Sequence, residues 1–140
     1  MPSYVPGYVL DASALIRFLD KEPGAERVRE ILRECIERRA DLCISAVQWG
    51  EVAANLRKRY GAVREKAIMS NVLPAEAKII PATAEHAVRA AALKVDRKLS
   101  YADGFAVDLA MESEDRVLVT ADFDFKVVED LARIEFLPAK

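Results

Sequence analysis

Short apolar segments alternate with longer segments of helical periodicity, and this alternation is the feature that most constrains the fold. The apolar segments cover residues 8–10, 42–44, 78–80, 117–119 and 134–137. Between the first two, Val28, Ile31, Leu32, Cys35 and Ile36 recur at the spacing of one face of an amphipathic helix. Strands that alternate with helices are typical of a parallel sheet covered on both faces. We therefore expect a three-layer α/β/α fold whose central parallel sheet has about five strands.

Helical patterns fill most of the chain between these strands, at residues 12–20, 28–36, 45–60, 62–73, 83–98 and 100–112. Two of them begin with a capping signal. Ser45 and Gln48 form an S-x-x-Q capping box, and Ser100 and Asp103 form a second capping pair. No repeat and no linker rich in Gly, Ser or Pro divides the chain, and 140 residues suit one hydrophobic core. We predict a single domain over residues 1–140.

The charge balance limits the classes of partner. The chain has 21 basic and 23 acidic residues, a formal net charge of -2, which argues against a protein that coats nucleic acid through bulk positive charge. It still allows an enzyme that contacts a few phosphates. No apolar run approaches the ~18 residues of a membrane span, and the beginning of the sequence does not resemble a signal peptide. We expect a cytoplasmic protein with no membrane partner, in which Cys35 and Cys43 are buried free thiols.

Four acidic residues are expected at one edge of the sheet. Asp11 ends the first strand, Asp122 follows the fourth, and Glu51 and Asp103 lie early in helices. Ligands of open α/β sheets bind outside the carboxyl ends of the strands, where the strand order reverses. Each acid also has a structural interpretation, either as a helix cap or, for Glu51, as a solvent-facing helix residue. Because four converging carboxylates repel one another, their combination predicts a bound divalent cation.

The residue types available narrow the choice of ion. His86 is the one histidine and both cysteines are expected in the core, so the nitrogen and sulfur ligands that zinc prefers are scarce. Carboxylate oxygens suit Mg²⁺ or Mn²⁺. Such an ion polarises phosphoryl oxygens and lowers the pKa of a bound water. The pattern predicts metal-dependent phosphoryl chemistry.

The segments that carry these acids resemble the motifs of PIN-domain ribonucleases. Residues 9–15, VLDASAL, are similar to the opening D-x-S/T-x-L of that family. Residues 44–52, 100–106 and 119–125 resemble the second, third and fourth motifs. The four motifs occur in the same order as in that family and extend over nearly the whole chain. The size of the chain is most similar to that of the VapC-type toxins of toxin–antitoxin modules.

The resemblance implies a sheet of strand order 3-2-1-4-5 and a set of site residues. The implied ligands of Mg²⁺ or Mn²⁺ are Asp11, Glu51, Asp103 and Asp122, with Asp124 as an additional candidate, and the hydroxyls implied to support them are Ser13 and Thr120. The implied activity is endoribonucleolytic hydrolysis of RNA by a metal-bound water, leaving 5′-phosphate and 3′-hydroxyl ends. The implied partners are an RNA substrate, a cognate antitoxin protein and a second copy of the chain in a homodimer.

Several residues are candidates for contacting RNA. Arg17 is expected on the helical face of Ser13, where it could reach a phosphate or be a solvated helix arginine. The basic residues 57–59 could form a phosphate track or a solvated face, and Trp49 and Tyr101 could stack on bases or pack in the core. Asp108 falls off the helical face of Asp103, so we expect a surface residue or a local ion pair.

Other functions remain open at this point. A degenerate PIN domain could act as an RNA- or protein-binding module without catalysis. A metal-dependent phosphatase of the haloacid dehalogenase type also begins with an aspartate after the first strand, although it needs a second aspartate where Ser13 stands. A receiver-type signalling domain requires paired acids and a late lysine, which Ala12, Ala121 and Phe123 do not match.

Overall fold

A computed structural model of the protein describes residues 5–140 and contains one five-stranded sheet. All neighbouring strands are parallel, in the order β3-β2-β1-β4-β5. The strands are β1 (Gly7–Leu10), β2 (Asp41–Ser45), β3 (Lys78–Ile80), β4 (Arg116–Thr120) and β5 (Arg133–Phe136). The predicted fold class and strand order are confirmed, and residues 1–4 of the predicted domain lie outside the described part.

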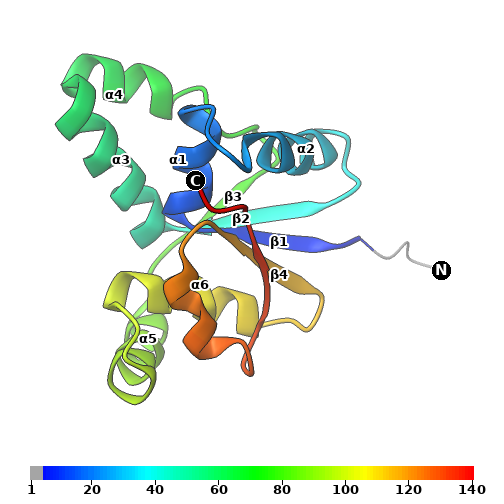
Figure 1. The fold of residues 1–140 in the computed structure, drawn as a ribbon, viewed down its shortest axis with the longest axis vertical. Coiled ribbons are helices and arrows are strands. Elements are labelled where there is room, and N and C mark those ends of the chain that lie inside the picture. The colour runs from blue at the N-terminus through cyan, green and yellow to red at the C-terminus, as the bar shows by residue number, and fades with distance from the viewer. Residues whose placement is uncertain (1–4) are drawn as a thin grey trace.

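Helices cover both faces of the sheet (Figure 1). They are α1 (Ala12–Leu19), α2 (Ala25–Ile36), α3 (Ala46–Tyr60), α4 (Ala62–Met69), α5 (Ala84–Arg97), α6 (Tyr101–Met111) and the 3₁₀ helix η1 (Phe123–Val128). Helix α4 ends before the predicted Leu73, because the Ser70 and Asn71 side chains donate to the carbonyls of Lys66 and Ala67. Such bonds compete with continuation of the helix. Within residues 5–140, no helix has both the length and the apolar content needed to cross a membrane.

The core is split into two layers by the sheet. Alternate residues of each central strand enter opposite layers, as the two-residue period of a strand requires. Leu10 and Val119 pack with α1, α2 and α3, whereas Val9 and Leu118 pack with α6 and η1. Cys43 is buried in the second layer and, like the buried Cys35, is a free thiol. Both faces of the sheet are therefore covered, so a ligand would approach it at the ends of the central strands.

Helix α6 is held against α5 by a close approach at Gly104. A Cβ atom at this position would lie 2.9 Å from the carbonyl oxygen of Ala90, closer than side-chain carbons approach backbone atoms. We expect Gly104→Ala to destabilise the fold by about 1–3 kcal/mol, because α5 and α6 would have to move apart. Gly50→Ala, where no atom lies within 4 Å of the added Cβ, is the matched control. Thermal unfolding should show a lower Tm for the first variant and an equal or higher Tm for the second.

The capping pair of Ser100 and Asp103 is correct, whereas the capping box of Ser45 and Gln48 is correct only for Ser45. The Ser100 hydroxyl accepts a hydrogen bond from the Asp103 amide at 3.1 Å, as expected. Ser45 also caps its helix, through the Val47 amide. The Gln48 side chain, however, does not return to Ser45; it is 2% exposed and bonds with residues of α1 and α6. A buried polar side chain must find partners, and those in reach of Gln48 are in other helices.

Candidate active site

Asp11 lies where β1 ends and α1 begins, almost completely buried. Its Oδ1 accepts hydrogen bonds from the Ala14 amide at 2.9 Å and from the Ser13 hydroxyl at 2.8 Å. Its Oδ2 accepts from the Thr120 hydroxyl at 2.7 Å. In turn, Ser13 Oγ accepts from the Ala121 amide at 2.9 Å, so the end of β1 is linked to the end of β4. Both hydroxyls therefore hold the Asp11 carboxylate in one orientation; their role in a reaction stays a prediction.

The buried position changes the acidity of Asp11. Burial raises the pKa of Asp11 to about 6, although hydrogen bonds from Thr120, Ala14 and Ser13 favour the charged form. The negative charge of Asp103 raises this pKa further. A carboxylate in such surroundings is costly to keep ionised without a cation.

Asp103 is close enough to other predicted acids for their negative charges to raise its pKa. It lies in the first turn of α6, and burial raises its pKa, with further increases from the charges of Asp122 and Glu51. Asp122 caps η1, where its Oδ1 accepts from the Asp124 amide at 2.9 Å, and Glu51 is exposed on α3. In the described chain, none of the four predicted ligands forms an ion pair with a basic residue. The structure thus brings them to one edge of the sheet without a compensating side-chain cation.

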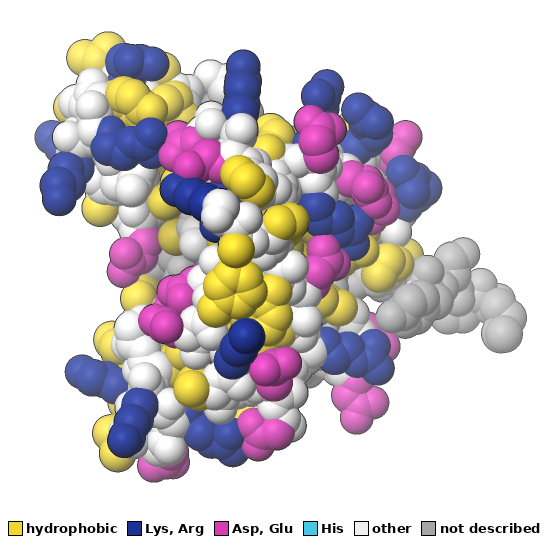
Figure 2. All heavy atoms as spheres, in the orientation of Figure 1, with side chains coloured by type: hydrophobic (Ala, Val, Ile, Leu, Met, Phe, Trp, Pro, Cys, Tyr) yellow, Lys and Arg dark blue, Asp and Glu magenta, His cyan; other side chains and the backbone are white. Residues whose placement is uncertain are grey.

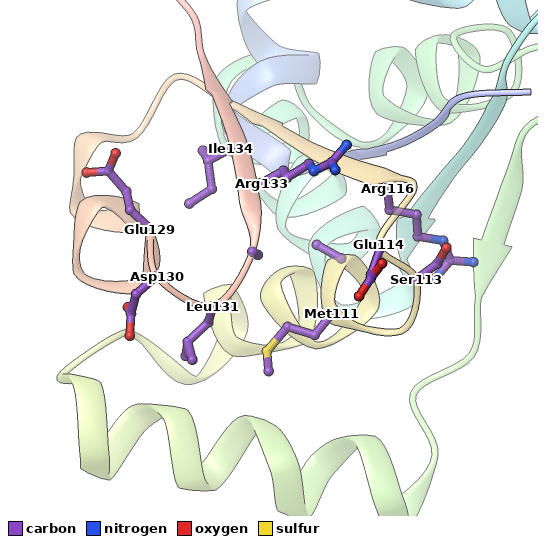
Figure 3. A pocket seen from close by; sticks show the side chains of 11 residues that line it. Met111, Ser113, Glu114, Arg116, Glu129, Asp130, Leu131, Arg133 and Ile134 are labelled. Carbon is purple, nitrogen blue, oxygen red and sulfur yellow. The ribbon is translucent and has the colours of Figure 1, made fainter.

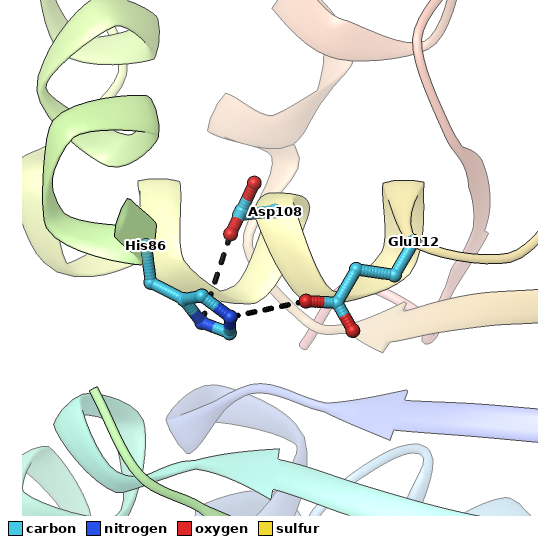
Figure 4. A group of neighbouring side chains, drawn as sticks. All are labelled: His86, Asp108 and Glu112. Atoms are coloured by element: carbon cyan, nitrogen blue, oxygen red, sulfur yellow. Dashed lines mark ion pairs between the residues drawn. The ribbon is translucent and has the colours of Figure 1, made fainter. Parts of the chain in front are cut away.

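A tighter group of possible metal ligands lies elsewhere, between α5 and α6 (Figure 4). Among residues 5–140, His86, Asp108 and Glu112 form the one group whose ligand atoms all lie within 4.8 Å of one another. The two ring nitrogens of His86 face different carboxylates, with Nδ1 3.7 Å from Asp108 and Nε2 3.1 Å from Glu112. Arg89 binds Asp108 at 2.7 Å and Arg116 binds Glu112 at 3.1 Å. Arginines already neutralise both carboxylates, so we interpret this group as a structural link.

This group also decides between the two alternatives expected for Asp108. The predicted local ion pair exists, with Arg89, but Asp108 is 4% exposed and is not a surface residue. An aspartate this deeply buried needs a charged partner, and no local pattern along the chain indicates that α5 supplies it.

Two cavities lie at different ends of the sheet. One of about 560 Å³ is lined by Ser13, Asp122, Phe123 and Asp124, so it opens beside the predicted acids. Another, of about 720 Å³, opens where β4 and β5 begin, beside Arg116 and Arg133 (Figure 3). The parallel strands place the acids at the opposite edge, so this second cavity is remote from them.

Arg17 is more constrained than its helical position suggested. Its side chain is buried, and Nη1 donates to the carbonyls of Pro23 and Pro138, each at 2.7 Å. The guanidinium therefore ties the C-terminal segment to the loop after α1. Contact with a phosphate would have to use its remaining nitrogens.

The other candidate RNA contacts are partly engaged within the protein. Arg57 pairs with Glu65, and Arg59 pairs with Asp20. Trp49 packs against the core. Tyr101 stays 42% exposed. On the face shown in Figure 2, basic and acidic side chains are interspersed, as the near-neutral net charge predicts.

Comparison with known families decides which protein class this arrangement belongs to. The PIN domain family matches residues 8–131, which include all but the first residue of β1, all four predicted acids and β4. The chain belongs to the PIN-domain family. No curated protein matches this PIN domain in sequence.

Solved structures of toxin–antitoxin systems share the fold of this PIN domain. VapBC2 from Rickettsia felis, bound to a DNA fragment from its promoter, aligns with a TM-score of 0.72 at 16% identity, covering 94% of this chain and 99% of that one. VapC20 from Mycobacterium tuberculosis, a toxin that cleaves the sarcin–ricin loop, aligns with a TM-score of 0.62 at 18% identity, covering 86% and 94%. A toxin–antitoxin complex from Klebsiella pneumoniae aligns with a TM-score of 0.59 at 23% identity, covering 84% and 89%.

Proposed function

We propose that this PIN domain is a metal-dependent endoribonuclease and the toxin of a VapBC-type toxin–antitoxin system. The observation that carries the proposal is that the Asp11 carboxylate is buried and hydrogen-bonded but has no cation beside it in the described chain. Asp11 is 2% exposed, and its carboxylate accepts hydrogen bonds from two hydroxyls and a backbone amide. Burial raises the pKa of Asp11, and the negative charge of Asp103 raises it further. A side chain placed this way is destabilised as an anion unless a cation joins it.

The donor set fits a hard divalent ion. The proposed ligands are carboxylate oxygens, from Asp11, Glu51, Asp103 and Asp122, with Asp124 as an additional candidate. His86 faces carboxylates between α5 and α6, and Cys35 and Cys43 are buried in the two core layers, so the proposed ligands include no nitrogen or sulfur atom. We therefore propose Mg²⁺ or Mn²⁺. When bound, the ion would polarise the scissile phosphate and lower the pKa of an attacking water.

The residues of the chain have separate tasks in this proposal. Ser13 and Thr120 would keep both oxygens of Asp11 facing the site, because each donates its hydroxyl proton to that carboxylate. The amide of Asp124 holds Asp122 in the same way. No protein nucleophile is required, since water supplies the attacking oxygen and RNA leaves with a 3′-hydroxyl end.

RNA would be held by a few local contacts. Phe123, 41% exposed, lines the cavity beside Asp122, and the Nζ of Lys126 lies 5.3 Å from its ring centroid. The remaining nitrogens of Arg17 and the basic residues 57–59 are further candidates. Together with the bound ion, such contacts would attract phosphate despite the net charge of -2.

The proposed partners follow from the structural neighbours. Several of these are complexes of a toxin with its antitoxin. We infer that this chain likewise binds a cognate antitoxin, acts in the cytoplasm and forms a homodimer.

A cleavage assay with and without metal tests the proposed function. Purified protein incubated with a structured RNA should cleave it with Mn²⁺ or Mg²⁺, and EDTA should reduce cleavage to background because the carboxylates alone supply no electrophile. The new ends should carry 5′-phosphates, detected by ligation to an adaptor. Cleavage that persists in EDTA would contradict the mechanism. RNA binding without cleavage, across several RNAs, would support a non-catalytic binding module instead.

A further inference from the structure

Gln48 lies at the junction of α1, which Asp11 caps, with α3 and α6, which carry Glu51 and Asp103. It lies on α3, one turn before Glu51, and its side chain is 2% exposed. Its Oε1 accepts a hydrogen bond from the Ala12 amide of α1 at 2.8 Å. Its Nε2 donates to the Ala102 carbonyl of α6 at 2.7 Å and to Asp103 Oδ1 at 3.3 Å.

Each backbone contact of Gln48 is adjacent in sequence to a proposed ligand. Ala12 follows Asp11, and Ala102 precedes Asp103. Within residues 5–140, Gln48 also supplies every side-chain hydrogen bond between α3 and α6. The orientation of the Gln48 side-chain amide is unambiguous, because the Ala12 N–H can only donate and the Ala102 C=O can only accept a hydrogen bond.

We propose that Gln48 is a positioning residue that keeps Asp11, Glu51 and Asp103 directed at one metal site. This inference rests on the proposed function. Glu51 shares the rigid helix of Gln48, while the planar amide holds the start of α1 on one side and the start of α6 on the other. Side chains that orient metal ligands commonly change metal affinity or activity 10–100-fold when they are removed.

Glutamine is suited to this position because one planar group offers both a donor and an acceptor. Methionine has a similar length but offers neither strong group. Glutamate has nearly the same shape, but its second oxygen would face two acceptors, the Ala102 carbonyl and Asp103. Gln48→Met therefore removes the link, and Gln48→Glu retains its shape while making one side repulsive.

The test measures Mn²⁺ binding by electron paramagnetic resonance in the full-length wild type, Gln48→Met and Gln48→Glu. We expect the dissociation constant for Mn²⁺ to rise 10–100-fold in both variants. For Gln48→Glu, the expected weaker binding of Mn²⁺ is the reverse of what charge alone would produce, since an added negative charge would strengthen cation binding. The kcat for RNA cleavage should fall at saturating RNA with little change in KM, and the Ala12 amide should exchange its hydrogen faster in Gln48→Met.

A matched control separates positioning from general loss of stability. Val52→Ala removes buried atoms one turn further along α3, where the side chain is 0% exposed and belongs to the core. It should lower Tm while leaving Mn²⁺ affinity unchanged. Equal loss of affinity in Val52→Ala, or wild-type affinity in both Gln48 variants, would overturn the inference. A wild type that binds no Mn²⁺ would overturn the proposed function first and this inference with it, so the two failures are distinguishable.

Discussion

Asp11→Asn is expected to reduce RNA cleavage about 1,000-fold, corresponding to about 4 kcal/mol of transition-state stabilisation. The substitution keeps the size of the side chain and an oxygen that can accept from the Ala14 amide, so the helix cap should survive. It removes the negative charge that we propose binds the metal. Single-turnover cleavage at saturating Mn²⁺ measures the effect on the chemical step.

Asp130→Asn provides the control for this prediction. Asp130 lies on the surface and pairs with Arg97, remote from the proposed ligands. Its replacement should leave cleavage within about twofold of wild type, because an exposed ion pair contributes little. An Asp11→Asn protein that is folded and as active as wild type would exclude Asp11 from the reaction.

The second large effect concerns the pH dependence of stability after metal removal. Burial raises the pKa of Asp11 from 3.8 to about 6, so the folded state holds the proton more tightly than the unfolded state does. The stabilisation is therefore complete below pH ~4 and is lost as the pH rises through about 6. A shift of this size corresponds to about 3 kcal/mol. The EDTA-treated protein should lose most of this unfolding free energy between pH 4 and 7.5 through Asp11 alone.

Comparison with Asp11→Asn isolates this contribution. Other groups also titrate, since the pKa of Asp103 is raised by burial and that of Asp130 is lowered by its hydrogen bond with Arg97. These groups are present in both proteins, so the difference in unfolding free energy from urea titrations reports mainly Asp11. The variant should become more stable than wild type as the pH rises, and saturating Mn²⁺ should reverse this order at pH 7.5. A difference that does not vary with pH would contradict the assignment.

Most of the fold could be predicted because its signals are local. Each strand is a short apolar run, and the helices show a regular apolar face, so element types and the layered class followed from periodicity. The strand order 3-2-1-4-5 came from the family resemblance and not from periodicity, because strand pairing depends on contacts between distant segments. The end of α4 was missed, since Ser70 and Asn71 stop it through their own side-chain bonds.

The candidate site was predictable in its charged residues and, through the family resemblance, in the hydroxyls of Ser13 and Thr120 that contact Asp11. Asp11 and Asp122 stand directly after strands, so the sequence places them at one edge of the sheet. The motif around Gln48 matched a helix-capping pattern equally well, and no local signal could reveal partners in α1 and α6. The partners of Arg17 and Asp108 could not be predicted for the same reason, because Pro138 and Arg89 are distant from them in sequence.

By itself, the sequence determined the alternation of strands and helices and the positions of the acids relative to the strand ends, since both depend on neighbours along the chain. Only the tertiary structure decided which polar groups are buried together. It placed Arg17 on Pro138, Gln48 between α1 and α6, and Arg89 on Asp108. The physical reason is that a buried polar group must be satisfied by whatever folding brings within hydrogen-bond reach, and that partner is not encoded by spacing along the chain.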